Sequence, residues 1–243
     1  MKHLKSIIGI MALCVAVSCT KSQNDAGGYV SFEVKNNQEV VEVTKSNVSD
    51  YTSLPSAGDF SIVIKDAEGT VLWTGKCADW DPTTALDEGE YVVEATYGNL
   101  EIEGFDKPYF YGVHAFTVVG KESTAVTVPV ALGNTIVKIE CSEYFKKYYT
   151  NYSFKLTRDG ADVVTFAKDD TRGAFIDGYK IKVEGVLTSE TKTQTFSAEY
   201  TNLHEATAYT LYFDASKVGG STITISFNDT VEEVELGNVE LND

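Results

Sequence analysis

Short runs of alternating hydrophobic and polar residues fill most of the chain. In one of them Val137, Ile139 and Cys141 fall on one face, with Lys138 and Glu140 between them. This alternation is typical of a β-strand with one buried face, because successive strand side chains point to opposite sides. Long stretches with helical spacing do not occur, and β-branched and aromatic residues abound. The pattern predicts an all-β protein.

The alternating runs predict two groups of strands. The first group covers 29–34, 39–44, 59–65, 70–74, 90–97, 113–119 and 125–131. The second group covers 135–141, 152–157, 162–166, 179–186, 193–200, 208–214, 222–227 and 231–241. Ser142 is placed to cap a short helical turn that follows the first strand of the second group.

The two groups of strands repeat one another loosely. A strand, a turn containing glycine and a returning strand occur at 60–72 and again at 152–164. A glycine with a nearby tyrosine opens an alternating strand at 88–95 and again at 177–183. The copies lie about 90 residues apart, close to the roughly 100 residues of an immunoglobulin-like β-sandwich. We therefore expect two tandem immunoglobulin-like β-sandwich domains.

The expected domains are residues 28–131 and residues 132–243. Between them Pro129 leads through Leu132 and Gly133 into the next strand, with almost no linker. A junction this short predicts two domains held end to end with little relative freedom. The result would be an extended rod, the shape that a stalk or spacer needs.

The first residues read as a signal for export. Lys2 and Lys5 precede an apolar run at 7–17, which is too short to span a bilayer. Small residues then lead to Cys19, as in the cleavage site of a bacterial lipoprotein. We expect a signal peptide at 1–18, a lipid on Cys19 and a flexible tether at 19–27. The alternative is an ordinary secretory signal with Cys19 as a plain thiol.

Charge and cysteine content narrow the possible partners. The net charge of −16 repels phosphate backbones, so nucleic-acid binding is disfavoured. Beyond the signal and Cys19, the remaining cysteines are Cys77 and Cys141. They fall in different expected domains, which favours separate thiols, but an oxidising envelope leaves a disulfide open.

The most distinctive internal string runs from Phe105 to Gly112 (FDKPYFYG). It is followed in order by Phe116-Thr117-Val118, Val126-Thr127-Val128, Leu132, Asn134, Val137-Lys138-Ile139, Phe145, Tyr148-Tyr149 and Tyr152. With the lipoprotein-like start, this order resembles a Bacteroidetes lipoprotein family of unknown function, number forty-four ninety-three in the unknown-function series. The resemblance spans roughly 29–213 and implies tandem immunoglobulin-like domains at a cell envelope. It implies no activity, and fimbrillin-like adhesins enter only as an analogy of fold.

Residues for catalysis or metal binding do not form a recognisable pattern. His114 and His204 lack further ligands at zinc-site spacing, and no Gly-x-Ser-x-Gly elbow or phosphate-binding glycine loop occurs. Asp79, Asp81 and Asp87 could in principle gather around calcium, but their order matches no calcium loop, and solvated turns are the better interpretation. We therefore predict no catalytic residue, no metal site and no cofactor.

Aromatic residues are the remaining candidates for ligand binding. Trp80 stands in a polar loop and is expected to be the most exposed, while Tyr109 and Tyr111 lie in the aromatic string. Exposed rings with nearby polar groups can bind sugars, although aromatic residues in sandwiches mostly fill cores and corners. Trp80, Tyr109 and Tyr111 are the predicted ligand-binding residues.

Two functions follow from this sequence. The first is a non-enzymatic envelope lipoprotein, either an adhesin-like interaction module or a passive spacer. The second is a glycan-binding accessory lipoprotein. Both place the protein on the outer membrane through its N-terminal lipid, on the surface or the periplasmic side, with a protein or glycan partner.

Overall fold

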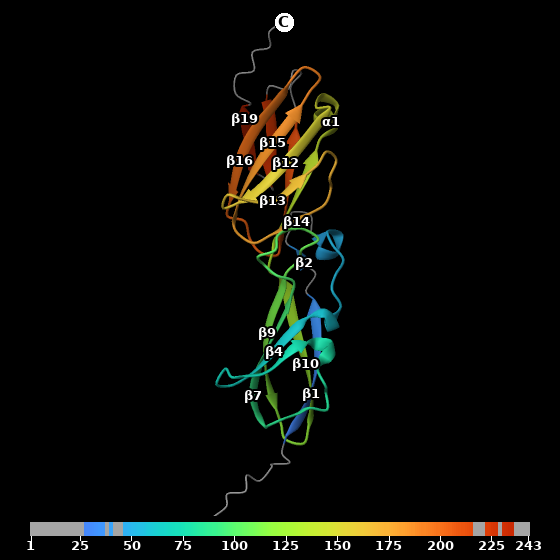
Figure 1. The fold of residues 1–243 in the computed structure, drawn as a ribbon, viewed down its shortest axis with the longest axis vertical. Coiled ribbons are helices and arrows are strands. Elements are labelled where there is room, and N and C mark those ends of the chain that lie inside the picture. Colours follow the sequence, from blue (N-terminus) through green and yellow to red (C-terminus); the bar gives the residue numbers. More distant parts are fainter. Residues whose placement is uncertain (1–26, 37–38, 41–45, 216–221, 228–229, 236–243) are drawn as a thin grey trace, which may run out of the picture.

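The computed structural model describes residues 27–36, 39–40, 46–215, 222–227 and 230–235. They form an elongated molecule that is almost entirely β-structure, with β1 at one end and α1 near the other (Figure 1). The expected all-β class is confirmed. The predicted signal peptide, Cys19 and the tether up to residue 26 lie outside the described residues. Within the described part of the chain, no helix is long and apolar enough to cross a bilayer.

The lower part of the molecule contains the elements from β1 to β10 except β8, and its strands form two layers. They belong to one seven-stranded sheet of the order β5-β4-β7-β9-β10-β1-β6, which divides between β9 and β10 into a four-stranded layer and a three-stranded layer. The bounds are β1 Gly28–Asn36, β4 Ser61–Asp66, β5 Val71–Lys76, β6 Ala85–Leu86, β7 Gly89–Tyr97, β9 Phe110–Val118 and β10 Ser123–Leu132. Strand β10 runs parallel to β1 for most of its length and pairs with β9 only at its last two residues, Ala131 and Leu132. It therefore links the two layers.

The upper part contains β8 and the elements from β11 onward. Its layers have the orders β13-β12-β15-β16 and β19-β18-β17-β11-β14-β8. The bounds are β8 Gly104–Phe105, β11 Thr135–Cys141, β12 Asn151–Arg158, β13 Ala161–Phe166, β14 Ala174–Ile176, β15 Lys180–Thr188, β16 Thr193–Thr201, β17 Thr207–Asp214, β18 Thr222–Phe227 and β19 Thr230–Glu235. Strand β8 is the exception to chain order, because it is contributed by the connection between β7 and β9.

The remaining elements are short. A small hairpin is formed by β2 Glu39–Val40 and β3 Ser46–Asn47, and three single turns of 3₁₀-helix are η1 Val48–Asp50, η2 Ala57–Asp59 and η3 Cys77–Asp79. Helix α1, Glu143–Tyr148, begins after Ser142, whose hydroxyl accepts a hydrogen bond from the Phe145 amide at 3.0 Å. The capped turn predicted after Ser142 is confirmed.

The same order of strands occurs twice, as the sequence repeat predicts. In each part the first strand is parallel to the last of the repeat, β1 to β10 and β11 to β17. In each part a hairpin is followed by a short strand that pairs with the first strand, β6 in the lower part and β14 in the upper. The four-stranded layers then match strand by strand, β5-β4-β7-β9 with β13-β12-β15-β16.

Two hydrophobic cores lie between the layers. The lower core includes Phe60, Trp80 and Phe110, and the upper core includes Phe154 and Phe213, which stack with ring centroids 4.2 Å apart. Phe110, Phe154 and Phe213 come from alternating positions of β9, β12 and β17, so the period of two in the sequence becomes the inward face of each layer. Phe60 and Trp80 come instead from the residues that follow η2 and η3. Each fully buried large apolar side chain stabilises the fold by about 1.5–3 kcal/mol.

The junction between the two parts is packed rather than linked. Ile136, Phe175 and Ala208 belong by sequence to the upper sheet, yet their side chains pack in the lower core. Strand β8 leaves the lower part and pairs with β14 of the upper part, Phe105 opposite Ala174. The division at residues 131 and 132 therefore stays a prediction, because burial continues across it.

Polar contacts reinforce the same junction. The Glu103 carboxylate, which is 10% exposed, accepts hydrogen bonds from Arg158 Nε at 2.8 Å and from the Asp177 amide at 2.7 Å. The Gly133 amide donates to the Tyr109 carbonyl at 2.8 Å, and the Asn134 side chain accepts from the Tyr109 amide. These bonds join segments that are far apart in the sequence, so they oppose bending at the junction.

Candidate functional site

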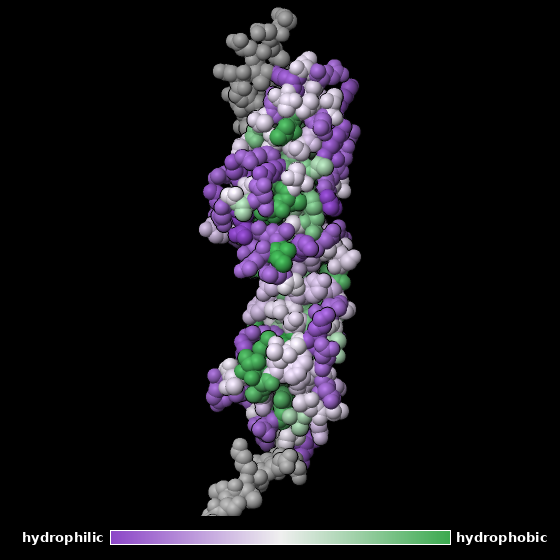
Figure 2. All heavy atoms as spheres, in the orientation of Figure 1, coloured by the Kyte–Doolittle hydropathy of each residue, from purple (hydrophilic) through white to green (hydrophobic). Residues whose placement is uncertain are grey.

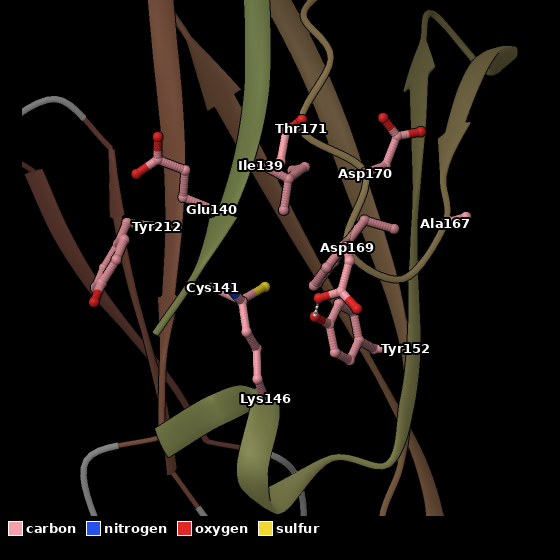
Figure 3. Close-up of a pocket in the computed structure, with 11 residues that line it drawn as sticks. Ile139, Glu140, Cys141, Lys146, Tyr152, Ala167, Asp169, Asp170, Thr171 and Tyr212 are labelled. Carbon is pink, nitrogen blue, oxygen red and sulfur yellow. Dashed lines mark hydrogen bonds between the residues drawn. The ribbon is translucent and has the colours of Figure 1, made fainter. Parts of the chain in front are cut away.

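A pocket of about 330 Å³ opens at the side of the upper part, next to the end of β11 (Figure 3). Its opposite wall is the segment between β13 and β14, and α1 lies at one end. The lining residues are Ile139, Glu140, Cys141, Lys146, Tyr152, Phe154, Ala167, Asp169, Asp170, Thr171 and Tyr212. The pocket therefore combines apolar side chains from the core with polar side chains from the rim.

Two carboxylates of the rim are held in place by neighbours. The Tyr152 hydroxyl donates to Asp169 Oδ1 at 2.7 Å, and the backbone of Asp169 has φ of 61°, in the left-handed region that aspartate tolerates (Figure 3). The Asp170 carboxylate pairs with Arg172 at 2.7 Å. Hydrogen bonds from Arg172 hold the pKa of Asp170 below its usual value, so it stays charged at neutral pH.

The Cys141 thiol faces the same pocket. Burial raises its pKa to about 12, although the Lys146 ammonium opposes that shift. Burial also raises the pKa of Tyr152, and the hydrogen bond to Asp169 adds to the rise. Because the thiolate is the nucleophilic form, Cys141 is a poor nucleophile at neutral pH.

Trp80 does not lie where the sequence placed it. Its side chain is 8% exposed, and its indole N–H donates to the Val30 carbonyl at 2.7 Å. The ring packs edge to face against Phe32 and Trp73, with centroids 5.4 Å and 5.2 Å away. The expectation of an exposed Trp80 is wrong, because a polar loop can still turn one ring inward when the indole finds an acceptor.

The two tyrosines of the aromatic string have different surroundings. Tyr111 on β9 is 44% exposed, whereas Tyr109 is half-buried and covers Gly133 at the junction, where an added Cβ would come within 2.7 Å of the ring. Phe110 between them is fully buried. The structure does not bring Trp80, Tyr109 and Tyr111 together in one site, and none of them lines the pocket beside β11.

Other candidates from the sequence also have defined places. Cys77 and Cys141 are free thiols, the former packed against the lower core and the latter against the upper. Asp81 accepts two hydrogen bonds from Thr83, which is a turn interaction. Across the part of the chain that the structure describes, no three His, Cys, Asp or Glu side chains are grouped to hold a metal ion.

The outer surfaces of the two parts differ in character. Figure 2 shows a large group of hydrophobic residues on the lower part, and hydrophilic residues with smaller hydrophobic groups among them on the upper part. Val71, Leu72 and Val113 of the lower part are 44–52% exposed. The upper four-stranded layer carries ion pairs of Lys155 with Asp162 at 2.7 Å and of Lys180 with Glu199 at 3.0 Å. The lower four-stranded layer has a comparable pair, Lys65 with Glu94 at 2.6 Å.

Comparison with known sequences places the chain in a family. The model of a domain of unknown function, DUF4493, matches residues 26–242. The chain belongs to this family. The match covers the lower part, the upper part and the junction between them, so the DUF4493 domain includes both parts. No curated protein sequence matches the chain.

Solved structures of Bacteroides and Parabacteroides proteins are similar to the chain over most of its length. A Bacteroides ovatus protein provisionally named for cell adhesion has 14% identity and a TM-score of 0.47, covering 88% of this chain and 98% of its own. A Bacteroides thetaiotaomicron protein provisionally named for polysaccharide binding has 12% identity and a TM-score of 0.41, covering 86% and 98%. A fimbrial assembly protein of Parabacteroides distasonis has 8% identity and a TM-score of 0.45, covering 72% and 90%.

Proposed function

We propose that this DUF4493 protein is a non-enzymatic lipoprotein of the cell envelope that acts as a stiff spacer and presents an interaction surface away from the membrane. The observation that carries the proposal is the packed junction. Ile136, Phe175 and Ala208 fill the lower core from the upper sheet, and β8 adds a lower segment to the upper sheet. Bending would expose these apolar side chains to water, at about 25 cal/mol for each Å² uncovered.

The positions of the two ends fit a spacer. Gly28, where β1 begins, lies at the lower end, and α1 lies near the opposite end (Figure 1). A lipid on Cys19, joined by the short tether, would anchor the lower end at a membrane. The end with α1 would then project farthest, and Tyr144 on α1 is 75% exposed there. An exposed aromatic side chain at that end suits contact with a partner.

The anchoring is tested by metabolic labelling. We expect labelled palmitate to enter the full chain and to be absent from the Cys19→Ala variant, with Cys77→Ala as the matched control that keeps the label. Incorporation of label into Cys19→Ala would contradict the lipid anchor.

Protease treatment of intact cells, with lysed cells as control, then distinguishes a surface position from a periplasmic one. Protection on intact cells would remove adhesion to external partners and leave a periplasmic spacer.

A glycan-binding function is the second candidate, favoured by the exposure of Tyr111. Tyr111 lies at an exposed position of β9, where its side chain offers both an apolar ring and a hydroxyl group to a sugar. On a glycan array we expect the Tyr111→Ala variant to lose the binding that the unaltered chain shows, while Tyr179→Ala, which removes a ring that is 72% exposed in the upper part, keeps it. Equal binding by both variants would remove Tyr111 from the proposal.

A further inference from the structure

The pocket beside β11 lies at an unpaired edge of a sheet. Strand β14 pairs with β11 only from Thr135 to Val137, although β11 continues to Cys141. The Ser142 amide donates to the Phe213 carbonyl on the β17 side. Because backbone groups alternate in direction along a strand, those of Ile139 and Cys141 face the opposite edge, toward the pocket.

The lower part has an equivalent edge, and a tryptophan closes it. Strand β6, the counterpart of β14, pairs with β1 only at Gly28 and Tyr29. At the next residue, the carbonyl of Val30 accepts the indole N–H of Trp80 at 2.7 Å. The Trp80 ring fills the space between the layers against Phe32 and is 8% exposed. The indole of Trp80 thus donates to a backbone carbonyl at the strand edge, and its ring fills the adjacent space in the core.

The segment that closes the lower edge has a counterpart without such a ring. Trp80 lies in the connection from β5 to β6, and the matching connection from β13 to β14 is 167–173, with the sequence AKDDTRG. This segment contains no aromatic residue, and Asp169 and Asp170 stand near the middle of it. The pocket of about 330 Å³ is lined by Ala167, Asp169, Asp170 and Thr171 of this segment, the topological counterpart of the Trp80 loop. Its volume falls within the range of about 300–1,000 Å³ of small-ligand pockets.

We propose that this pocket binds a planar aromatic group that carries an N–H or O–H donor, an indole or a phenol, in the position that Trp80 occupies in the lower part. The ring would lie against Ile139 and Phe154, and its donor would face the Ile139 carbonyl at the open edge of β11. Asp169, fixed by Tyr152, and Lys146 stand at the rim, where they can bind polar groups attached to the ring. This inference goes beyond the spacer function and does not depend on it.

The probe for this site is N-acetyl-L-tryptophanamide, titrated into the full chain and followed by amide chemical shifts. We expect shifts concentrated at residues 139–141 and 167–171, and at least tenfold weaker binding of N-acetyl-L-leucinamide, which lacks the ring and the donor. Equal binding of the two probes, no binding, or shifts spread over other surfaces would overturn the proposal. This map needs no variant, so it stands even if a substitution disturbs folding.

A variant that supplies the missing ring provides the second test. In Asp169→Trp the new side chain should occupy the pocket and weaken probe binding at least tenfold, while Lys147→Trp, at an exposed position of α1, should leave it unchanged. Unweakened binding of the probe to a folded Asp169→Trp variant would contradict the site.

The peptide acetyl-Thr-Thr-Trp-Thr-Thr-amide then identifies the source of the ring. Binding at least tenfold tighter than the single amide indicates a polypeptide side chain, and equal binding indicates a small aromatic molecule.

Discussion

Individual side chains decide how each part of the molecule closes. Trp80 shows that a ring in a polar loop becomes structural when a backbone carbonyl, that of Val30, is within reach of its indole N–H. Cys141 shows the reverse case, since a thiol next to a lysine stays protonated when burial outweighs the nearby charge. In both cases the environment of the side chain, rather than its neighbours in sequence, sets its role.

Trp80→Ala should destabilise the protein strongly. The substitution empties part of the lower core and leaves the Val30 carbonyl without its donor, so we expect a loss of about 3–5 kcal/mol in the free energy of unfolding. Urea denaturation measures this loss. Tyr144→Ala is the matched control, because its ring is 75% exposed, and it should change stability by less than about 0.5 kcal/mol. Equal effects of the two variants would refute the structural role of Trp80.

Cys141 makes stability depend on alkaline pH. Its pKa is about 12 in the folded chain and about 8.5 when unfolded, so only the unfolded state releases the proton between these values. Its stabilising contribution is therefore complete below about pH 8.5 and declines as the pH rises, by at most about 1.4 kcal/mol per unit. From pH 8 to 11 the unaltered chain should lose stability relative to Cys141→Ala. Parallel pH profiles of the two proteins would contradict the shift.

At the scale of the elements, the sequence predicts the longer strands and the repeat well. Alternation locates β7, β11, β15 and β16 to within a few residues, because each buries one face. It does not find β6, β8 or β14, since strands of two or three residues are too short to show a period. Their pairing partners, and the passage of β10 between layers, depend on contacts distant in sequence.

The candidate site could be predicted only in part, for the same reason. Tyr111 is exposed as a ligand-binding ring must be. Nothing near Trp80 in the sequence reveals that its indole N–H donates a hydrogen bond to the carbonyl of Val30, fifty residues earlier. The pocket beside β11 was not predicted, because it arises where the pairing of β11 with β14 ends, at Val137. The signal that could have found it is the repeat itself, since aligning the two copies sets the Trp80 loop against a segment without a ring.

Glu103 is the element-scale test of the junction. Glu103→Ala removes the carboxylate that accepts hydrogen bonds from Arg158 and from the Asp177 amide, so we expect a loss of about 2–4 kcal/mol in the free energy of unfolding. Differential scanning calorimetry should show a lower transition temperature. Glu143→Ala breaks an ion pair whose carboxylate is 91% exposed and should have little effect. If the contacts of Glu103 did not stabilise the junction, Glu103→Ala and Glu143→Ala would lower the transition temperature by the same small amount.

At the scale of the whole molecule, we infer that the packed junction makes one stiff body out of the two cores. Most interfaces between domains are loose enough that relative motion is the default expectation. Here apolar side chains cross from one part into the core of the other, and a strand of one part completes a sheet of the other. Stiffness would let an anchored protein hold its far end at a fixed distance from the membrane, and the proposed spacer function depends on this property.

The distance between the two parts in solution tests this stiffness most directly. Spin labels would be placed at exposed Thr74 on β5 and exposed Thr195 on β16. Pulsed electron–electron double resonance would then give the distribution of distances between the labels. A label pair within the lower part, Thr74 and Thr117, provides the width due to the labels alone. The background would have serine at Cys14, Cys19, Cys77 and Cys141. The account predicts one narrow peak, no broader than that of the control pair. A broad or multiple distribution would show that the junction bends, and it would contradict the stiff spacer.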